Sequence, residues 1–91
     1  MIARRLIETG DRMKQLRTDL RVAEEQLLHF ASEADDARLR SLVSETPLSD
    51  REHRDAERHA NAMRRHRDEL VAELARLEEQ QDQLLDQLSG G

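Results

Sequence analysis

One six-residue stretch decides the fold of this chain: Glu45-Thr46-Pro47-Leu48-Ser49-Asp50. It contains the only proline of the sequence, and proline interrupts helices because it lacks the N–H that continues the hydrogen-bond ladder. On both sides of it, apolar residues recur at every seventh position over several heptads. Such a sustained repeat is typical of coiled-coil helices. The stretch therefore predicts a turn between two long helices.

The two repeats assign the residues that would face each other, at heptad positions a and d, which we call the seam. Before the turn, a holds Leu6, Met13, Leu20, Leu27 and Ala34, and d holds Ile2, Thr9, Leu16, Ala23, Phe30 and Ala37. After it, d holds Ala56, Met63, Leu70, Leu77 and Leu84, and a holds His53, Ala60, Arg67, Leu74, Gln81 and Leu88. The pattern predicts an all-α fold: a single antiparallel coiled-coil hairpin over residues 1–91.

The expected boundaries are a first helix at about residues 2–44, a tip at 45–49, a second helix at about 50–88 and a disordered tail at 89–91. The run from Ser49 to Glu52 fits a capping box, in which a hydroxyl and a carboxylate accept hydrogen bonds from exposed backbone N–H groups. Thr46 followed by Pro47 offers an alternative start one turn earlier, since proline suits the first helical position.

Two features suggest irregularities in the first helix. Gly10 costs about 1 kcal/mol relative to Ala in a helix interior, so we expect fraying or bending there. Beyond Ala37 the apolar residues are Leu39, Leu42 and Val43, which predicts that the seam changes phase near the tip.

Composition fits a coiled coil better than a globular domain. Charged residues make up 38% of the chain and aromatic residues 1%, too little apolar surface for a conventional core. The net charge of −5 gives no reason to expect nucleic-acid binding. There is no cysteine, and no apolar run reaches the length of a membrane span. We expect a cytoplasmic protein, and the preference for Arg over Lys suggests a GC-rich bacterial source.

The order of charges along the chain supports the antiparallel arrangement. Residues 4–21 are mainly basic and 24–36 carry five acids without a base, whereas 51–67 are rich in Arg and 68–86 are mainly acidic. Folding at Pro47 places unlike blocks side by side. We therefore expect the arginines of 51–67 to pair with the acids of 24–36, a patterning that selects orientation more than stability.

Several apolar residues fall outside the seam. Ile7, Val22, Leu28, Val71 and Leu85 form a candidate oligomer face. They could broaden the seam of an isolated hairpin, or they could form a second face for a four-helix homodimer or a partner protein. We favour the second face, because Val71 and Leu85 would otherwise lie exposed on a highly charged helix.

The tip set is a second candidate surface, for docking onto a larger protein: Leu42, Val43, Pro47, Leu48 and Asp50. The run Leu48-Ser49-Asp50-Arg51-Glu52, with Arg54-Asp55-Ala56-Glu57-Arg58-His59-Ala60 after it, resembles the tip and second helix of transcript-cleavage factors. Those factors insert an acidic-tipped helical hairpin into the secondary channel of RNA polymerase, so the resemblance implies a transcription-associated regulator. It covers about a dozen residues and does not assign the chain to that family.

Ligand sites are less well marked. Arg54, Arg58 and Arg65 are candidates for binding an anion such as a nucleotide, although neither helix carries the spaced Glu, Ser, Arg, Gln and Asp positions of hairpin anti-sigma factors that bind a cyclic dinucleotide. Asp50-x-x-His53 is the only match to a metal-binding Asp/Glu-x-x-His pattern, so we expect no metal or other cofactor. No nucleophile motif or phosphate loop is present. The sequence predicts a non-enzymatic interaction module; the alternatives are a purely structural oligomer and a nucleotide-responsive hairpin.

Overall fold

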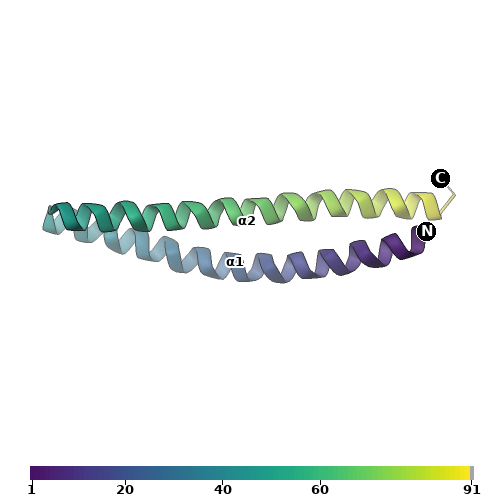
Figure 1. Cartoon of the computed structure of the whole chain (residues 1–91), viewed down its shortest axis with the longest axis horizontal. Coiled ribbons are helices and arrows are strands. Elements are labelled where there is room, and N and C mark those ends of the chain that lie inside the picture. Colours follow the sequence, from purple (N-terminus) through teal and green to yellow (C-terminus); the bar gives the residue numbers. More distant parts are fainter. Residues whose placement is uncertain (91) are drawn as a thin grey trace. The chain divides into compact units, whose positions relative to one another are not determined.

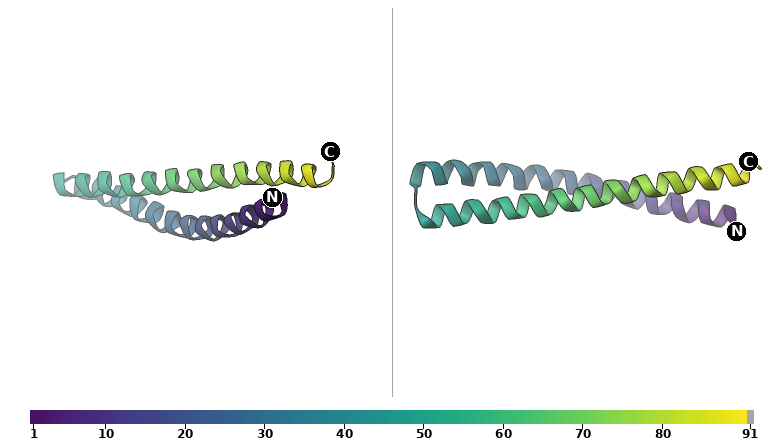
Figure 2. Two further views of the ribbon diagram at one scale, coloured as in Figure 1. Left: turned by 45° about the vertical axis from the view of Figure 1, so that its right-hand side comes forward. Right: turned by 90° about the horizontal axis from the view of Figure 1, so that it is seen from above.

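The computed structural model describes residues 1–90 and contains two helices, α1 (Ile2–Ser44) and α2 (Pro47–Leu88) (Figure 1). No strand occurs among these residues. The further views in Figure 2 follow the chain from α1 through two linking residues into α2. The predicted all-α two-helix hairpin is confirmed, and α1 has the expected bounds.

The end of α1 is set by Glu45. Its backbone has a φ of 52°, the left-handed conformation that glycine normally supplies after a helix. Its N–H donates a hydrogen bond of 2.9 Å to the carbonyl oxygen of Ser41, which satisfies one of the last free carbonyls of α1. A non-glycine residue here carries backbone strain because Cβ approaches the following carbonyl oxygen.

Replacing Glu45 by Gly should therefore stabilise the hairpin. We expect Glu45→Gly to raise the free energy of unfolding by about 0.5–1 kcal/mol, since relief of strain exceeds the added freedom of the unfolded chain. Urea denaturation followed by circular dichroism measures this. Glu45→Ala is the control: it removes the same carboxylate but keeps Cβ, so a gain as large as that of Gly would contradict the backbone explanation.

The start of α2 lies three residues before the predicted position 50. Thr46 caps the helix and Pro47 occupies its first position. The N–H of Ser49 donates to Thr46 Oγ1 at 3.1 Å, and the N–H of Thr46 donates to Ser49 Oγ at 3.2 Å. This reciprocal pair is a capping box built on Thr46 and Ser49, so the predicted box at Ser49 and Glu52 is wrong and the earlier alternative holds.

The chain divides into two compact units. The terminal unit comprises Met1–Arg21 with Asp68–Gly91, and the tip unit comprises Val22–Arg67. In the terminal unit the seam is built mainly from large side chains: Leu16 is 0% and Leu84 1% exposed, and Met13, Leu70 and Thr9 are also buried. These leucines supply most of the apolar burial, at about 2 kcal/mol each. Leu88, assigned to the seam by its spacing, is exposed at the end of α2.

In the tip unit the seam is built from small side chains. Ala23, Ala34, Ala37 and Ala60 are buried, whereas Phe30 and Met63 are half-buried. The predicted change of phase is wrong, because the seam continues in register to Ser41, which is half-buried. The three apolar residues that suggested it are exposed: Leu39, Leu42 and Val43.

Gly10 neither ends nor interrupts α1, which runs through it as continuous helix. A Cβ added at this position would meet no atom within 4 Å. We therefore expect Gly10→Ala to raise the free energy of unfolding by about 0.5–1 kcal/mol, because Ala loses less conformational entropy in a helix. Thermal unfolding measures the change. A lower melting temperature for this variant would show that the helix needs the glycine.

The end of the chain was predicted as a disordered tail over 89–91. Ser89 and Gly90 form a turn, in which the N–H of Gly90 donates to the carbonyl of Gln87 at 3.3 Å and Gly90 has a φ of 75°. Position 91 lies outside the described residues.

Candidate interaction surfaces

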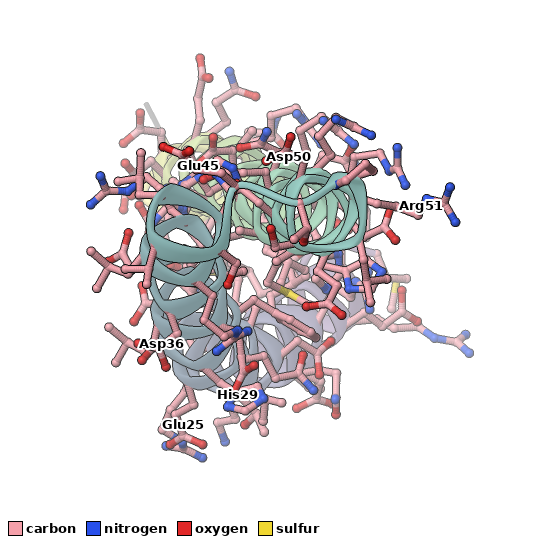
Figure 3. All side chains as sticks on the ribbon, turned by 90° about the vertical axis from the view of Figure 1, so that its left-hand side faces the viewer. Glu25, His29, Asp36, Glu45, Asp50 and Arg51 are labelled. Carbon is pink, nitrogen blue, oxygen red and sulfur yellow. The ribbon has the colours of Figure 1, made fainter. Side chains whose placement is uncertain are left out.

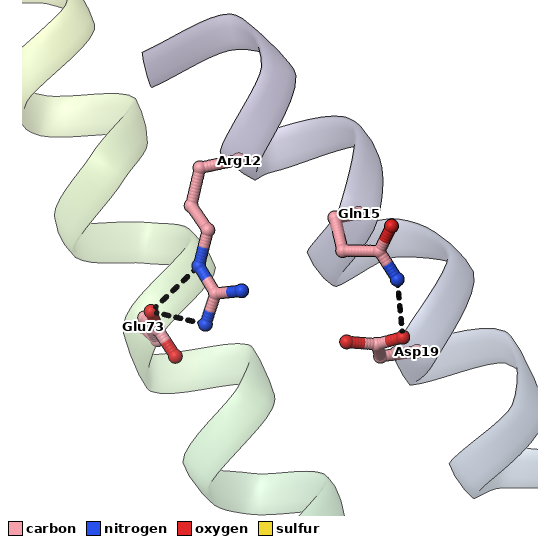
Figure 4. Close-up of polar contacts among 4 residues, drawn as sticks. All are labelled: Arg12, Gln15, Asp19 and Glu73. Atoms are coloured by element: carbon pink, nitrogen blue, oxygen red, sulfur yellow. Dashed lines mark hydrogen bonds and ion pairs between the residues drawn. The ribbon is translucent and has the colours of Figure 1, made fainter. Parts of the chain in front are cut away.

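One ion pair crosses the terminal unit. Arg12 donates from Nε at 3.2 Å and from Nη2 at 3.0 Å to the same carboxylate oxygen of Glu73 (Figure 4). Arg12 lies in the basic start of α1 and Glu73 in the acidic end of α2, so within this unit one contact of the kind that the order of charges predicts is formed. Both side chains are partly exposed, and such a pair is worth at most about 1 kcal/mol. It selects orientation and register.

The apolar residues predicted to lie off the seam of the terminal unit are exposed: Ile7, Val71 and Leu85. Val71 and Leu85 are fourteen residues apart and therefore share one face of α2. Val71 is 46% and Leu85 47% exposed, and both interpretations of these residues stay predictions. Glu78 lies between them at the same heptad position and is also exposed.

The tip unit exposes a larger group of apolar side chains. Val22 and Leu28 of the candidate oligomer face are exposed, and Leu28 is 75% exposed. In the tip set, Leu42, Val43 and Leu48 are exposed, with Val43 at 86%. Leu39 is exposed as well, although the sequence pattern assigned it to the seam.

Pro47 and Asp50, the other two members of the tip set, have structural roles. Pro47 begins α2, and Asp50 is the acidic residue in its first turn, where a negative charge is favourable at a helix N-terminus. The hydroxyl of Ser41 donates a hydrogen bond to a carboxylate oxygen of Asp50 and so joins the end of α1 to the start of α2. These contacts join the two helices at the tip, whose leucines and valine are exposed.

Charges in the tip unit do not pair as predicted. Arg58 pairs with Asp55 and Arg64 donates to Asn61, all within α2. Across the described residues 1–90, the acids at positions 24–36 make no ion pair. The predicted pairing between these acids and the arginines of 51–66 is therefore wrong.

The reason is geometric. Arg51, Arg54, Arg58 and Arg65 recur at intervals that place them on the face of α2 opposite its seam residues. Figure 3 shows Arg51 on one side of the tip unit and Asp36 on the other. Arg54 and Arg65 are exposed, while Arg58 is engaged by Asp55. The anion-binding role of Arg54, Arg58 and Arg65 stays a prediction.

A groove between α1 and α2 opens beside the small seam residues of the tip unit. It has a volume of about 380 Å³, and the residues that line it are His29, Phe30, Glu33, Ala37, Arg40, Glu52, Asp55, Ala56 and His59. The Phe30 ring meets the imidazoles of His29 and His59 edge-on, with centroids 5.6 and 5.9 Å apart. A second hollow of about 320 Å³ is lined by Phe30, His59, Ala62 and Met63, so Phe30 and Met63 lie close together.

The groove follows from the alanine seam, because alanines bring the helices together but do not cover the neighbouring aromatic ring. It is open to solvent.

No group of three or more His, Asp or Glu side chains within residues 1–90 is placed to hold a metal ion. His53, at its seam position, is half-buried. Its Nε2 atom lies 3.6 Å from Oε1 of Glu57. Neither helix has the length of apolar sequence that a membrane span needs.

Sequence reasoning missed two parts of these surfaces. The exposure of Leu39 could have been found by extending the heptad strictly to Ser41 rather than following apolar residues. The groove left no sequence signal beyond the run of alanines at the seam.

Comparison of the chain with protein-family models, curated proteins and solved structures gave no match.

Proposed function

We propose that this protein is a non-enzymatic interaction module, whose hairpin presents apolar side chains on surfaces away from its seam. The observation that carries the proposal is the exposure of large apolar residues on both units, among them Ile7, Val71 and Leu85 on the terminal unit and the tip set on the tip unit. Both surfaces lie on regular helix or at its capped end, so they are preformed and lose little entropy on binding.

Self-association through the terminal unit is the first part of the proposal. The chain exposes 6679 Å², whereas a folded monomer of 10.6 kDa exposes about 5,500 Å² by the usual scaling with mass. The excess, about 1,200 Å², arises because a helix pair covers only one side of each helix. A second copy, packed on the face that carries Val71 and Leu85, would form a four-helix dimer and cover part of that surface.

Docking of the tip unit on another protein is the second part. The leucines and the valine of the tip set are anchored on a turn fixed by Thr46, Ser49 and the Ser41–Asp50 hydrogen bond. An apolar projection of this kind suits insertion into a pocket of a larger protein. Regulation of transcription is the process we propose for that partner, following the resemblance of the tip sequence to transcript-cleavage factors.

Introducing charge on the terminal face tests the self-association directly. We expect Val71→Glu with Leu85→Glu to convert a dimer into a monomer while circular dichroism reports unchanged helix content, because both residues are exposed in the hairpin but would be buried in the dimer. Light scattering after size exclusion measures the mass.

The matched control is Ala72→Glu with Ala75→Glu, which adds the same charge at exposed positions on the same segment of α2. The control should keep the mass of the unmodified protein. If the control dissociates the dimer equally, charge rather than the apolar face is responsible. If the first variant loses helix content instead, the two residues belong to the fold and the proposal fails.

A further inference from the structure

The ion pair between α1 and α2 in the terminal unit lies on one side of the seam. Arg12 and Glu73, which form it (Figure 4), both occupy heptad position g when the seam residues take a and d. In an antiparallel helix pair, g faces g on one side of the seam and e faces e on the other. We call the second side of the terminal unit the e side.

On the e side, α2 presents a stripe that combines apolar and acidic residues. We call it the acidic stripe and define it by four exposed residues at positions e and b: Val71, Glu78, Asp82 and Leu85. Glu78 and Asp82 make no ion pair within residues 1–90. No Lys or Arg lies three or four residues from either acid, so no base on the same helix face neutralises them. Their charge is available to a partner.

On the same side, α1 presents a stripe of the opposite charge. We call it the basic stripe and define it by four residues that also occupy positions b and e: Ile7, Gly10, Lys14 and Arg17. Lys14 and Arg17 are exposed and make no ion pair in the described part of the chain. Asp11 is the one acid three or four residues from either base. Over the whole stretch, residues 4–21 carry six bases and three acids, whereas 68–86 carry seven acids and one base.

We propose that a second copy of this chain packs its basic stripe on the acidic stripe, so that α1 of each copy lies antiparallel to α2 of the other. The inference rests on the proposed function and names the surface of the second copy that meets Val71 and Leu85. A two-fold axis along the terminal unit forms both contacts at once, because it brings each α1 onto the α2 of the other copy. The assembly closes as a four-helix bundle whose neighbouring helices are antiparallel.

The side chains of the two stripes differ in size as well as in charge. Val71 and Leu85 on α2 are large, whereas α1 has Ala3 and Gly10 at its e positions. A Cβ added at Gly10 would meet no atom within 4 Å, so the surface of α1 is open there. Large side chains pack well against small ones because facing layers then interdigitate. Size therefore favours the same pairing of α1 with α2 as charge does.

The alternative arrangement of two copies places α1 on α1 and α2 on α2. It brings the two basic stretches together and the two acidic stretches together, and like charges placed side by side oppose association. It also sets the large residues of the two acidic stripes against each other, while small residues face small ones between the basic stripes. Charge and size both disfavour it.

Reversing the charge of one stripe should weaken the dimer. We expect Lys14→Glu with Arg17→Glu, and separately Glu78→Lys with Asp82→Lys, to raise the Kd of self-association at least tenfold, and less at high salt. Sedimentation equilibrium measures the Kd, and circular dichroism reports the helix content. The matched control is Glu79→Lys with Asp86→Lys, the same changes at exposed f positions of α2 outside the stripe, which should change the Kd less than threefold.

A chain that combines both reversals distinguishes the two arrangements. This swapped chain carries Lys14→Glu, Arg17→Glu, Glu78→Lys and Asp82→Lys, so its own stripes are again opposite in charge and it should dimerise with itself. It should not form mixed dimers with the unmodified chain, because acid then meets acid and base meets base. Resonance energy transfer between dyes attached at Ser89→Cys measures mixing, since the chain has no cysteine of its own.

The inference fails if mixed dimers form in preference, because only packing of α1 on α1 brings unlike charges together in the mixture. It also fails if the single reversals leave the Kd unchanged, if the control weakens the dimer equally, or if the swapped chain is helical but monomeric. In each of these cases the unmodified chain can still be a dimer, so the proposed self-association stands. An unmodified chain with the mass of one copy at every concentration refutes the dimer and this arrangement together.

Discussion

Leu16→Ala should lower the free energy of unfolding by about 3 kcal/mol or more. Leu16 is fully buried at a d position in the terminal unit, and its truncation removes apolar contacts and leaves a cavity that a helix pair fills only in part. Leu84 is the other large side chain with almost no exposed surface. Because so few large residues form this core, loss of one removes a large share of the total stability.

Urea denaturation followed by far-ultraviolet circular dichroism measures the effect of Leu16→Ala. The control is Leu28→Ala, the same substitution on the same helix at an exposed position, which should change the free energy of unfolding by less than about 0.5 kcal/mol. Comparable losses in the two variants would contradict the assignment of the seam in the terminal unit.

Ala60→Asp should lower the free energy of unfolding of the tip unit by at least as much as Leu16→Ala lowers that of the terminal unit. Ala60 is 0% exposed, at an a position where neighbouring seam residues are alanines that permit close approach of the helices. A short carboxylate cannot reach solvent from there, and burial of an unpaired charge costs several kcal/mol. We expect the pairing of α1 and α2 in this unit to be lost at neutral pH.

Ala62→Asp is the matched control for Ala60→Asp. It makes the same change two residues along the same helix, at an exposed position, and so includes the same loss of helix propensity. We expect it to keep its helix content and to unfold within about 1 kcal/mol of the unmodified chain. The amide spectrum of residues 22–67 reports whether the tip unit stays folded. Native spectra for both variants would show that Ala60 does not lie in a tight seam.

The sequence was sufficient to predict the helix pairing because a heptad repeat constrains every turn of both helices. The predictions made from the sequence were wrong at places where single polar contacts decide the structure. Ser41 continues the seam through a hydrogen bond to Asp50, which no count of apolar residues detects. Thr46 and Ser49 cap α2 with each other, and two overlapping cap patterns in the same stretch could not be separated by sequence alone.

The charge blocks show what a linear pattern omits. In the terminal unit one predicted pair forms, between Arg12 and Glu73, because both residues flank the seam. In the tip unit Arg51, Arg54, Arg58 and Arg65 lie opposite the seam of α2, and Glu33, which lines the groove between the helices, shares it with the acids Glu52 and Asp55. Unlike charge at the same level of a hairpin therefore does not imply pairing. Which residues reach the surface therefore depends on rotation about the helix axis rather than on composition.

The mass of the unmodified chain in solution tests the central claim, that the apolar surface outside the seam serves association, more directly than any variant. Sedimentation equilibrium across the micromolar range should give twice the chain mass of 10.6 kDa, falling toward one chain only on dilution. A single mass of 10.6 kDa at every concentration would contradict self-association through the face of Val71 and Leu85.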